Sequence, residues 1–266
     1  MQYVNLHNHT VYSDGKDTME ANVESAIQKN MYALGFSDHS YTPCDESYCM
    51  MPQEYGSYLQ EIARLKEKYK GRISIYAGLE LDHNSEPDTT AFDYCLASVH
   101  YIVRNGRTYA IDHSLVQQEQ CCKDVFGGDK LAMAKCYYDQ LVGHVERCKP
   151  TFVGHFDVIS KFSYMPEDDP RYQEIAAVAL EEIVKICPYI EVNTGAIARK
   201  CRTTPYPARF LLEKMLSLGA KPVLGSDSHQ KENLTFWFDE AVALLKEVGF
   251  ASIARFEGTG FTDVMI

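Results

Sequence analysis

Seven segments of the chain share one design, in which a short apolar run is followed directly by polar residues. The runs and their endings are YVNL-HNH, LGFS-DH, ISIYAGL-E, YCLASV-H, TFVG-H, YIEVN-T and PVLGS-DSH. Six of the seven endings carry His, Asp or Glu, and only the YIEVN ending lacks a metal-type ligand. In a β/α barrel the carboxyl ends of the strands meet on one face, where active sites lie. We therefore predict that these side chains converge on a buried site for several metal ions.

The apolar runs alternate with longer segments of helical periodicity, an order that is typical of parallel βαβ units. Strands are predicted at 3–6, 32–37, 73–79, 93–99, 151–154, 189–193 and 221–225, with a further candidate at 252–256. Helices are predicted at 18–30, 53–69, 129–148, 171–187, 206–218 and 236–248. This pattern favours an α/β barrel, closed or distorted, over an open sheet. Since the composition shows no break, residues 1–266 are predicted to form a single domain.

Two long loops follow predicted ligands on the same face. Residues 40–52 come after His39, and residues 101–128 come after His100, with Asn105-Gly106 and Gly127-Gly128 as turn signals. Loops that leave the catalytic face of a scaffold commonly carry functional residues. Both loops are therefore candidates for walls or lids around a substrate.

Charge and cysteine content narrow the function classes. A net charge of −11 argues against a general nucleic-acid or membrane-surface binder, although metal ions and local cations allow an acidic enzyme to bind an anion. The nine cysteines form no Cys-x-x-Cys and resemble neither a disulfide framework nor a thiolate zinc site. The first residues do not resemble a signal peptide, and no apolar run is long enough to span a membrane. We expect a cytoplasmic protein.

Each ligand candidate has an ordinary structural interpretation when it is taken alone. His7 and His9 share one face of a strand, Glu80 is a strand-end carboxylate, and His100 and His155 are typical of core histidines. The recurrence of the same plan at six strand ends favours the metal interpretation for all of them. Asp157, two residues after His155, is a candidate acceptor that fixes the tautomer of a ligand imidazole. Ligands of the His, Asp and Glu types without Cys predict Zn, Mn or Fe(II).

The motifs HNHTVYSDG, GFSDH, GLE, SVH, GHFD and GSDSH resemble those of the polymerase-and-histidinol-phosphatase (PHP) superfamily, and most closely its monofunctional histidinol-phosphatase branch. This resemblance implies a distorted (β/α)7 barrel with three divalent metal ions at the carboxyl ends of the strands. It assigns His7, His9, Glu80 and Asp227 to the first ion, Glu80, His100 and His155 to the second with Glu80 bridging, and Asp14, His39 and His229 to the third.

The activity implied by the resemblance is hydrolysis of L-histidinol phosphate to L-histidinol and phosphate in histidine biosynthesis, by attack of a hydroxide that bridges two metals. Its catalytic residues would be Glu80, Asp227 and His229. Lys161 and Arg199 would bind the phosphate, although relatives more often have Arg near the first of these positions. The ammonium and imidazole of the substrate should meet acidic or aromatic loop residues, for which the candidates are Tyr41, Asp45, Glu46 and Tyr101.

Two other functions agree with the same motifs. One is another PHP-type phosphoesterase that acts on phosphotyrosine, nucleotides or a broad range of esters. The other is a non-catalytic domain that uses metal for stability, which is disfavoured because every expected ligand position holds a competent residue. The acidic balance disfavours a polynucleotide substrate. A small phosphate ester is the predicted partner, with no nucleic acid and no membrane, and the oligomeric state is not predicted.

Overall fold

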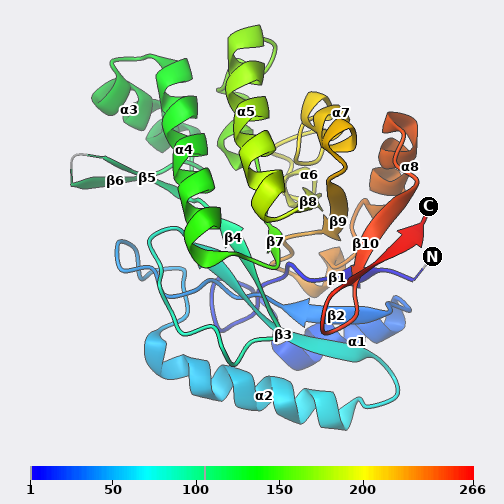
Figure 1. Ribbon diagram of the computed structural model, residues 1–266. Helices are drawn as coiled ribbons and strands as arrows, with labels where there is room; N and C mark the ends of the chain where they lie inside the picture. The colour runs from blue at the N-terminus through cyan, green and yellow to red at the C-terminus, as the bar shows by residue number, and fades with distance from the viewer. Residues whose placement is uncertain (1, 105) are drawn as a thin grey trace.

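The computed structural model describes residues 2–104 and 106–266 of the chain. Its centre is a seven-stranded, all-parallel sheet that curves into a nearly closed barrel (Figure 1). In pairing order the strands are β1 (Val4–Asn5), β2 (Ala33–Phe36), β3 (Ser74–Asp82), β4 (Tyr94–Ser98), β7 (Phe152–Val153), β8 (Tyr189–Asn193) and β9 (Lys221–Gly225). The segments after β1 and β9 meet, because the His9 N–H donates to the Ser228 carbonyl at 2.8 Å. The predicted barrel is thereby confirmed.

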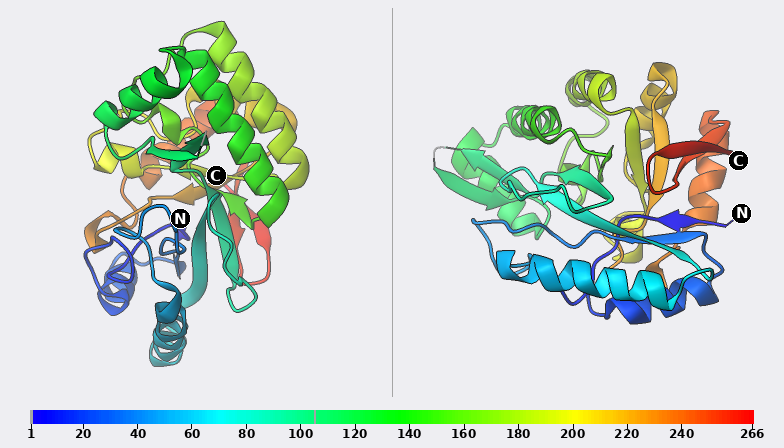
Figure 2. Two further views of the ribbon diagram at one scale, coloured as in Figure 1. Left: turned by 90° about the vertical axis from the view of Figure 1, so that its left-hand side faces the viewer. Right: turned by 60° about the horizontal axis from the view of Figure 1, so that its bottom comes forward.

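Helices surround the barrel, with α1 and α2 on one side and α4, α5, α7 and α8 on the other (Figures 1 and 2). They are α1 (Met19–Gln28), α2 (Tyr55–Lys68), α3 (Leu115–Phe126), α4 (Lys130–Cys148), α5 (Pro170–Ile186), α6 (Gly195–Ala198), α7 (Arg209–Leu218) and α8 (Phe238–Val248). Capping side chains begin several of them: Asp129 accepts from the Leu131 and Ala132 N–H groups, and Asp169 accepts from the Arg171 N–H. The six predicted helices are confirmed to within about one turn at their ends.

Tyr94 fills the inside of the barrel below the strand ends. Its hydroxyl donates toward the carbonyl oxygens of Leu6 and Phe36, at 2.5 and 3.0 Å. A Cβ added at Gly78 would lie 2.0 Å from the Tyr94 ring, and one at Gly35 would lie 2.4 Å from its hydroxyl. These two glycines therefore give the aromatic ring the space that it occupies.

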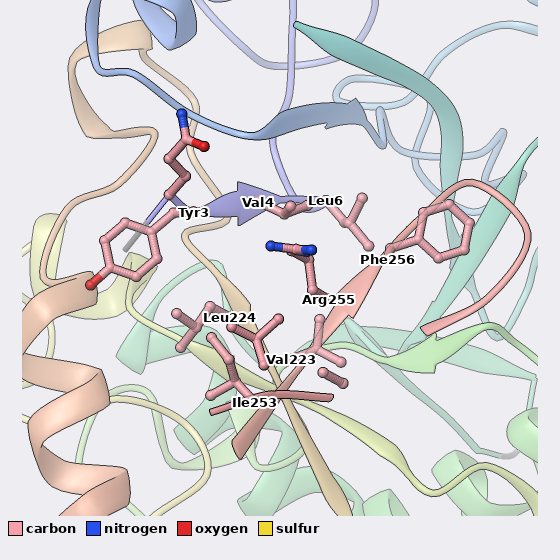
Figure 3. Close-up of a pocket in the computed structure, with 11 residues that line it drawn as sticks. Tyr3, Val4, Leu6, Val223, Leu224, Ile253, Arg255 and Phe256 are labelled. Carbon is pink, nitrogen blue, oxygen red and sulfur yellow. The ribbon is translucent and has the colours of Figure 1, made fainter. Parts of the chain in front are cut away.

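The amino end of the barrel is closed by apolar side chains from the C-terminal hairpin, β10 (Ser252–Phe256) and β11 (Phe261–Met265). The predicted strand 252–256 is present, but it pairs with β11 instead of joining the seven-stranded sheet. Figure 3 shows Val4, Leu6, Val223 and Phe256 beside a cavity of about 20 Å³ there, which has room for roughly one water molecule. At the amino end of the barrel, the side chains therefore serve mainly to pack against one another.

The segment 101–128 is more regular than the loop predicted from the sequence. It contains the antiparallel hairpin β5 (Tyr101–Arg104) and β6 (Arg107–Ala110), and then the 12-residue helix α3. The hairpin projects from the end of the barrel opposite β10 and β11 (Figures 1 and 2). The Asn105 half of the predicted Asn105-Gly106 turn lies outside the described residues, whereas Gly127 ends α3 with a φ of 62°.

All nine cysteines, each of which lies in the described residues, are free. None of the helices in the described residues combines the length and the hydropathy needed to span a lipid bilayer.

Candidate metal centre and its cleft

The nine side chains predicted as metal ligands lie together at the carboxyl end of the barrel. In chain order they are His7 and His9 after β1, Asp14 in the following loop, His39 after β2, Glu80 in β3, His100 after β4, His155 after β7, and Asp227 and His229 after β9. Within the described part of the chain they form four overlapping groups, in each of which the ligand atoms lie within 4.8 Å of one another. The folded chain thus brings all nine to one place.

Glu80 is the hub of this cluster, and its side chain is fully buried. Its Oε2 atom lies 3.3 Å from His7 Nε2 and 3.0 Å from His39 Nδ1. Its Oε1 atom lies 3.1 Å from His155 Nε2 and 3.4 Å from His100 Nε2. The two oxygens therefore face two different sets of imidazoles, which is the arrangement that a bridging carboxylate requires.

A third set of ligands lies nearer to solvent. Asp14 Oδ2 is 3.1 Å from His229 Nε2, and Asp14 Oδ1 is 3.7 Å from His39 Nε2. His9 joins this set, with Nδ1 3.9 Å from Asp14 Oδ1, and it also approaches Asp227 Oδ1 through Nε2 at 3.2 Å. His9 thus stands between the first and third predicted sites, whereas the sequence interpretation placed it in the first alone.

The cluster fits metal ions because several of its buried polar atoms have no other partner. The Nε2 atoms of His7 and His9 and the Oε2 atom of Glu80 make no hydrogen bond to any of residues 2–104 and 106–266. Leaving a buried polar atom unpaired costs about 1–3 kcal/mol. Their convergence is explained if cations bind between them, and the His, Asp and Glu donor set suits Zn, Mn or Fe(II).

The charged groups of the cluster strongly shift the pKa values of one another. Burial favours protonation of Glu80, but His7, His39 and His100 lower the pKa of its carboxyl well below the ordinary value. Burial opposes protonation of His7, yet the Glu191, Glu80 and Asp227 carboxylates raise its pKa well above 6.5. By contrast, burial and the neighbouring His39 and His229 lower the pKa of His9 to about 3. The carboxylates of the cluster are therefore ionised at neutral pH and attract cations.

Two buried carboxylates behind the cluster were not predicted from the sequence. Glu191 in β8 accepts a hydrogen bond from His7 Nδ1 at 2.8 Å, and Asp82 in β3 accepts one from His100 Nδ1 at 3.2 Å. The feature of the sequence that could have identified them is a charged residue within, or directly after, an apolar run that forms a buried strand. The role predicted for Asp157 is wrong, since neither His155 Nδ1 nor Asp157 Oδ1 makes a hydrogen bond within the described residues. Asp157 Oδ2 instead accepts from the Ala208 N–H at 3.0 Å, and burial raises the pKa of Asp157 to about 7.

The cluster opens into a cleft of about 460 Å³, which both predicted phosphate-binding cations line. Arg199 donates to the Asp227 carboxylate at 2.6 Å and to its carbonyl at 2.9 Å, and Lys161 lies 3.3 Å from Asp112. Arg202, three residues after Arg199, is instead buried against Ser160 and Glu167. The structure therefore favours Arg199 over Arg202 as a cation that can reach a ligand.

The outer wall of the cleft comes from the two long segments after His39 and His100. Asp45, Tyr48, Tyr101 and His113 line it, and the Tyr101 hydroxyl donates to Asp45 Oδ2 at 2.9 Å. Tyr41 and Glu46 are the other two residues predicted to meet the ammonium and imidazole of the substrate. They pair with each other away from the cleft, since the Tyr41 hydroxyl donates to Glu46 Oε1 at 2.6 Å. His144 in α4 has a structural role, since its Nε2 atom bonds to the Leu81 carbonyl at 2.9 Å.

A parallel barrel that carries a buried His and carboxylate cluster at its strand ends is typical of metal-dependent hydrolases. Residues 5–195 match the model of the PHP domain, and this match covers more than half of the sequence. The chain therefore belongs to the PHP family.

Curated relatives align over most of the chain. A probable histidinol-phosphatase of Schizosaccharomyces pombe is 26% identical over 96% of this chain and 89% of its own. The histidinol-phosphatase of Bacillus subtilis is 24% identical over 90% of this chain and 98% of its own.

A crystal structure of histidinol phosphate phosphatase from Lactococcus lactis subsp. lactis has the same fold. It superposes with a TM-score of 0.74 at 22% identity, covering 98% of this chain and 99% of that one. The Lactococcus protein was crystallised with Zn, L-histidinol and phosphate.

Proposed function

We propose that this PHP-family protein hydrolyses L-histidinol phosphate to L-histidinol and phosphate. The observation that carries the proposal is the cluster of nine ligands in a cleft that is also lined by two cations and by acidic and aromatic side chains. The names of the aligned relatives support the substrate. The protein therefore has histidine biosynthesis as its proposed role.

The cluster is proposed to hold three divalent ions, of Zn, Mn or Fe(II). Glu80 would bridge the first two through its two oxygens, since each oxygen faces a separate set of imidazoles. His7, His9 and Asp227 would complete the first site, His100 and His155 the second, and Asp14, His39 and His229 the third. When bound, such ions neutralise the charge of a phosphate dianion and lower the pKa of a bound water.

Arg199 and Lys161 are proposed to bind and orient the phosphate group. Both side chains line the cleft beside the cluster. The hydrogen bonds from Arg199 to Asp227 hold its guanidinium in place before a substrate arrives, and Asp112 does the same for the Lys161 ammonium. Positioned charges of this kind accelerate phosphoryl transfer because they need little rearrangement during the reaction.

The amine end of the substrate is proposed to lie against Asp45 and Tyr101. Histidinol carries an ammonium group, and a carboxylate on the cleft wall is a suitable partner for it. Asp45 is held in place by the Tyr101 hydroxyl and by the Ser47 N–H and hydroxyl, at 2.9, 3.0 and 2.6 Å. Those donors lower the pKa of Asp45 in spite of partial burial, so the group stays negative at neutral pH.

Steady-state phosphate release tests the proposed substrate. Protein reloaded with Mn, Zn or Fe(II) would be assayed with L-histidinol phosphate, phosphotyrosine, AMP and p-nitrophenyl phosphate. We expect kcat/KM for histidinol phosphate to exceed the others at least about a hundredfold, which is roughly 2.7 kcal/mol of transition-state discrimination. A flat profile or a preference for another ester would replace the proposed substrate with a broader phosphoesterase activity.

A further inference from the structure

Glu191 is a fully buried carboxylate in the middle of β8. Its Oε1 atom accepts from His7 Nδ1 at 2.8 Å. Its Oε2 atom accepts from the His155 backbone N–H at 2.8 Å and from Asn193 Nδ2 at 2.9 Å. One side chain therefore connects two proposed metal ligands that are far apart in the chain, one after β1 and the other after β7.

The neighbouring strand leaves space for this carboxylate. Gly225 in β9 has no side chain, and a Cβ added there would lie 1.8 Å from Glu191 Oε1 and 2.7 Å from its Cδ atom. No other amino acid at position 225 is compatible with the observed position of the carboxylate. Glu191 thus supplies the carboxylate, and Gly225 leaves the space in which it lies.

The hydrogen bond to Glu191 determines which nitrogen of His7 is free. A carboxylate only accepts hydrogen bonds, so the proton of the contact must be on His7 Nδ1. In the neutral ring Nε2 then carries the lone pair, and this atom points toward Glu80 Oε2 at 3.3 Å. His7 Nε2 makes no hydrogen bond within the described residues. The tautomer that Glu191 selects is therefore the one that presents Nε2 to a metal ion.

His155 is held in a different way. Glu191 binds its backbone N–H, and the His155 ring remains directed at Glu80 Oε1 through Nε2, at 3.1 Å. His7 Nε2 faces the other Glu80 oxygen. Glu191 thus holds one ligand on each side of the proposed bridging carboxylate.

We propose that Glu191 is a positioning residue that fixes the His7 tautomer and holds the His155 backbone, so that the first two metal sites form with the correct spacing. The inference rests on the proposed metal centre of this enzyme and extends it to a residue that touches neither metal nor substrate. An amide in place of the carboxylate would set its N–H₂ group either against the His155 N–H, where that contact would be lost, or against His7 Nδ1, where the contact would survive only in the tautomer that carries the proton on Nε2.

The test is the affinity for Zn²⁺ measured by competition with a chromophoric chelator, which needs no substrate. Glu191→Gln is expected to weaken binding at the affected sites by about 10- to 100-fold, the usual effect of losing such a partner. Gly225→Ala should weaken binding similarly, because it displaces the carboxylate while leaving it chemically intact. Glu182→Gln, on the exposed surface of α5, and Gly56→Ala, whose added Cβ would meet no atom within 4 Å, are the matched controls.

The thermal unfolding of the metal-free proteins separates positioning from general stability. Positioning predicts weaker Zn²⁺ binding in both variants while the metal-free midpoint of at least one stays close to that of the wild type. Unchanged Zn²⁺ affinity in the two variants would overturn the inference. It would also be overturned if both variants lose affinity and both also unfold at a clearly lower temperature without metal. The proposed substrate fails separately, if the wild type binds Zn²⁺ but does not prefer histidinol phosphate.

Discussion

The two ends of the barrel are built from the same strands but have opposite chemistry. At the carboxyl end, imidazoles and carboxylates converge around the buried Glu80. At the amino end, apolar side chains that include Leu6, Val223 and Phe256 pack together. Successive residues of a strand point in opposite directions, so Leu79 packs toward the helices while Glu80 points into the cluster. Stability and chemistry are thus located at different ends of one sheet, and substitutions at the two ends should have different effects.

The largest effect is expected for Glu80→Gln at the carboxyl end. The amide cannot bridge two cations, so kcat/KM for phosphate esters should fall more than about 1,000-fold, or roughly 4 kcal/mol, together with loss of metal from the first two sites. Steady-state kinetics and elemental analysis of the same preparation measure both. Near-normal turnover would show that Glu80 is not a bridging ligand.

At the amino end, Phe256→Ala should lower the free energy of unfolding by about 3–5 kcal/mol, because it opens a cavity in packed surroundings. Chemical denaturation of the metal-free protein measures this loss. The folded variant should keep its Zn²⁺ affinity, and Phe236→Ala, at a side chain that is 39% exposed, should cost less than about 1 kcal/mol. Strongly reduced metal affinity in folded Phe256→Ala would mean that the two ends are not independent.

Arg199→Ala is expected to have an intermediate effect at the mouth of the carboxyl end. Losing hydrogen bonds from a positioned cation to a phosphate costs about 1.5–3 kcal/mol, so KM for small phosphate esters should rise roughly 10- to 100-fold. Lys161→Ala should act in the same direction. The exposed neighbour Lys200 provides the control substitution to Ala. Unchanged kinetics in both Arg199→Ala and Lys161→Ala would place the phosphate elsewhere.

Asp45→Asn should have the smallest effect and the most selective one. It removes the charge opposite the substrate ammonium, so KM for histidinol phosphate should rise about tenfold while p-nitrophenyl phosphate is unaffected. Glu46→Gln is the matched control, since Glu46 pairs with Tyr41 away from the cleft. An equal effect of Asp45→Asn on both esters would contradict a role in recognising the amine.

The ligands at the carboxyl end of the barrel could largely be predicted, because most of them can be recognised from the residues that directly precede them in the sequence. Except for Asp14, each ligand lies in a short apolar run or within a few residues of its end, so strand prediction and ligand type together place His7, His100 and His155 on one face. Glu80 differs only in detail, as it lies inside β3 rather than after it. The family resemblance supplied the assignment of the ligands to three ions.

The remaining features depend on contacts that the sequence does not display. The partners of Glu191 follow β1 and β7, so its role appears only when the barrel closes. Asp157 was assigned to His155 by proximity in sequence, but its side chain accepts from Ala208. The turn signals within 101–128 predict a loop, whereas the structure forms the hairpin of β5 and β6 and the helix α3 there.

The number of metal ions bound per chain tests the central claim most directly. Metal-free protein would be reconstituted with Zn²⁺, Mn²⁺ or Fe²⁺, passed through a desalting column and analysed for metal and for protein. A multinuclear centre at the strand ends predicts roughly three ions per wild-type chain and fewer in Glu80→Gln. A wild-type chain that retains no metal, and hydrolyses phosphate esters equally well in the presence of a strong chelator, would contradict the account.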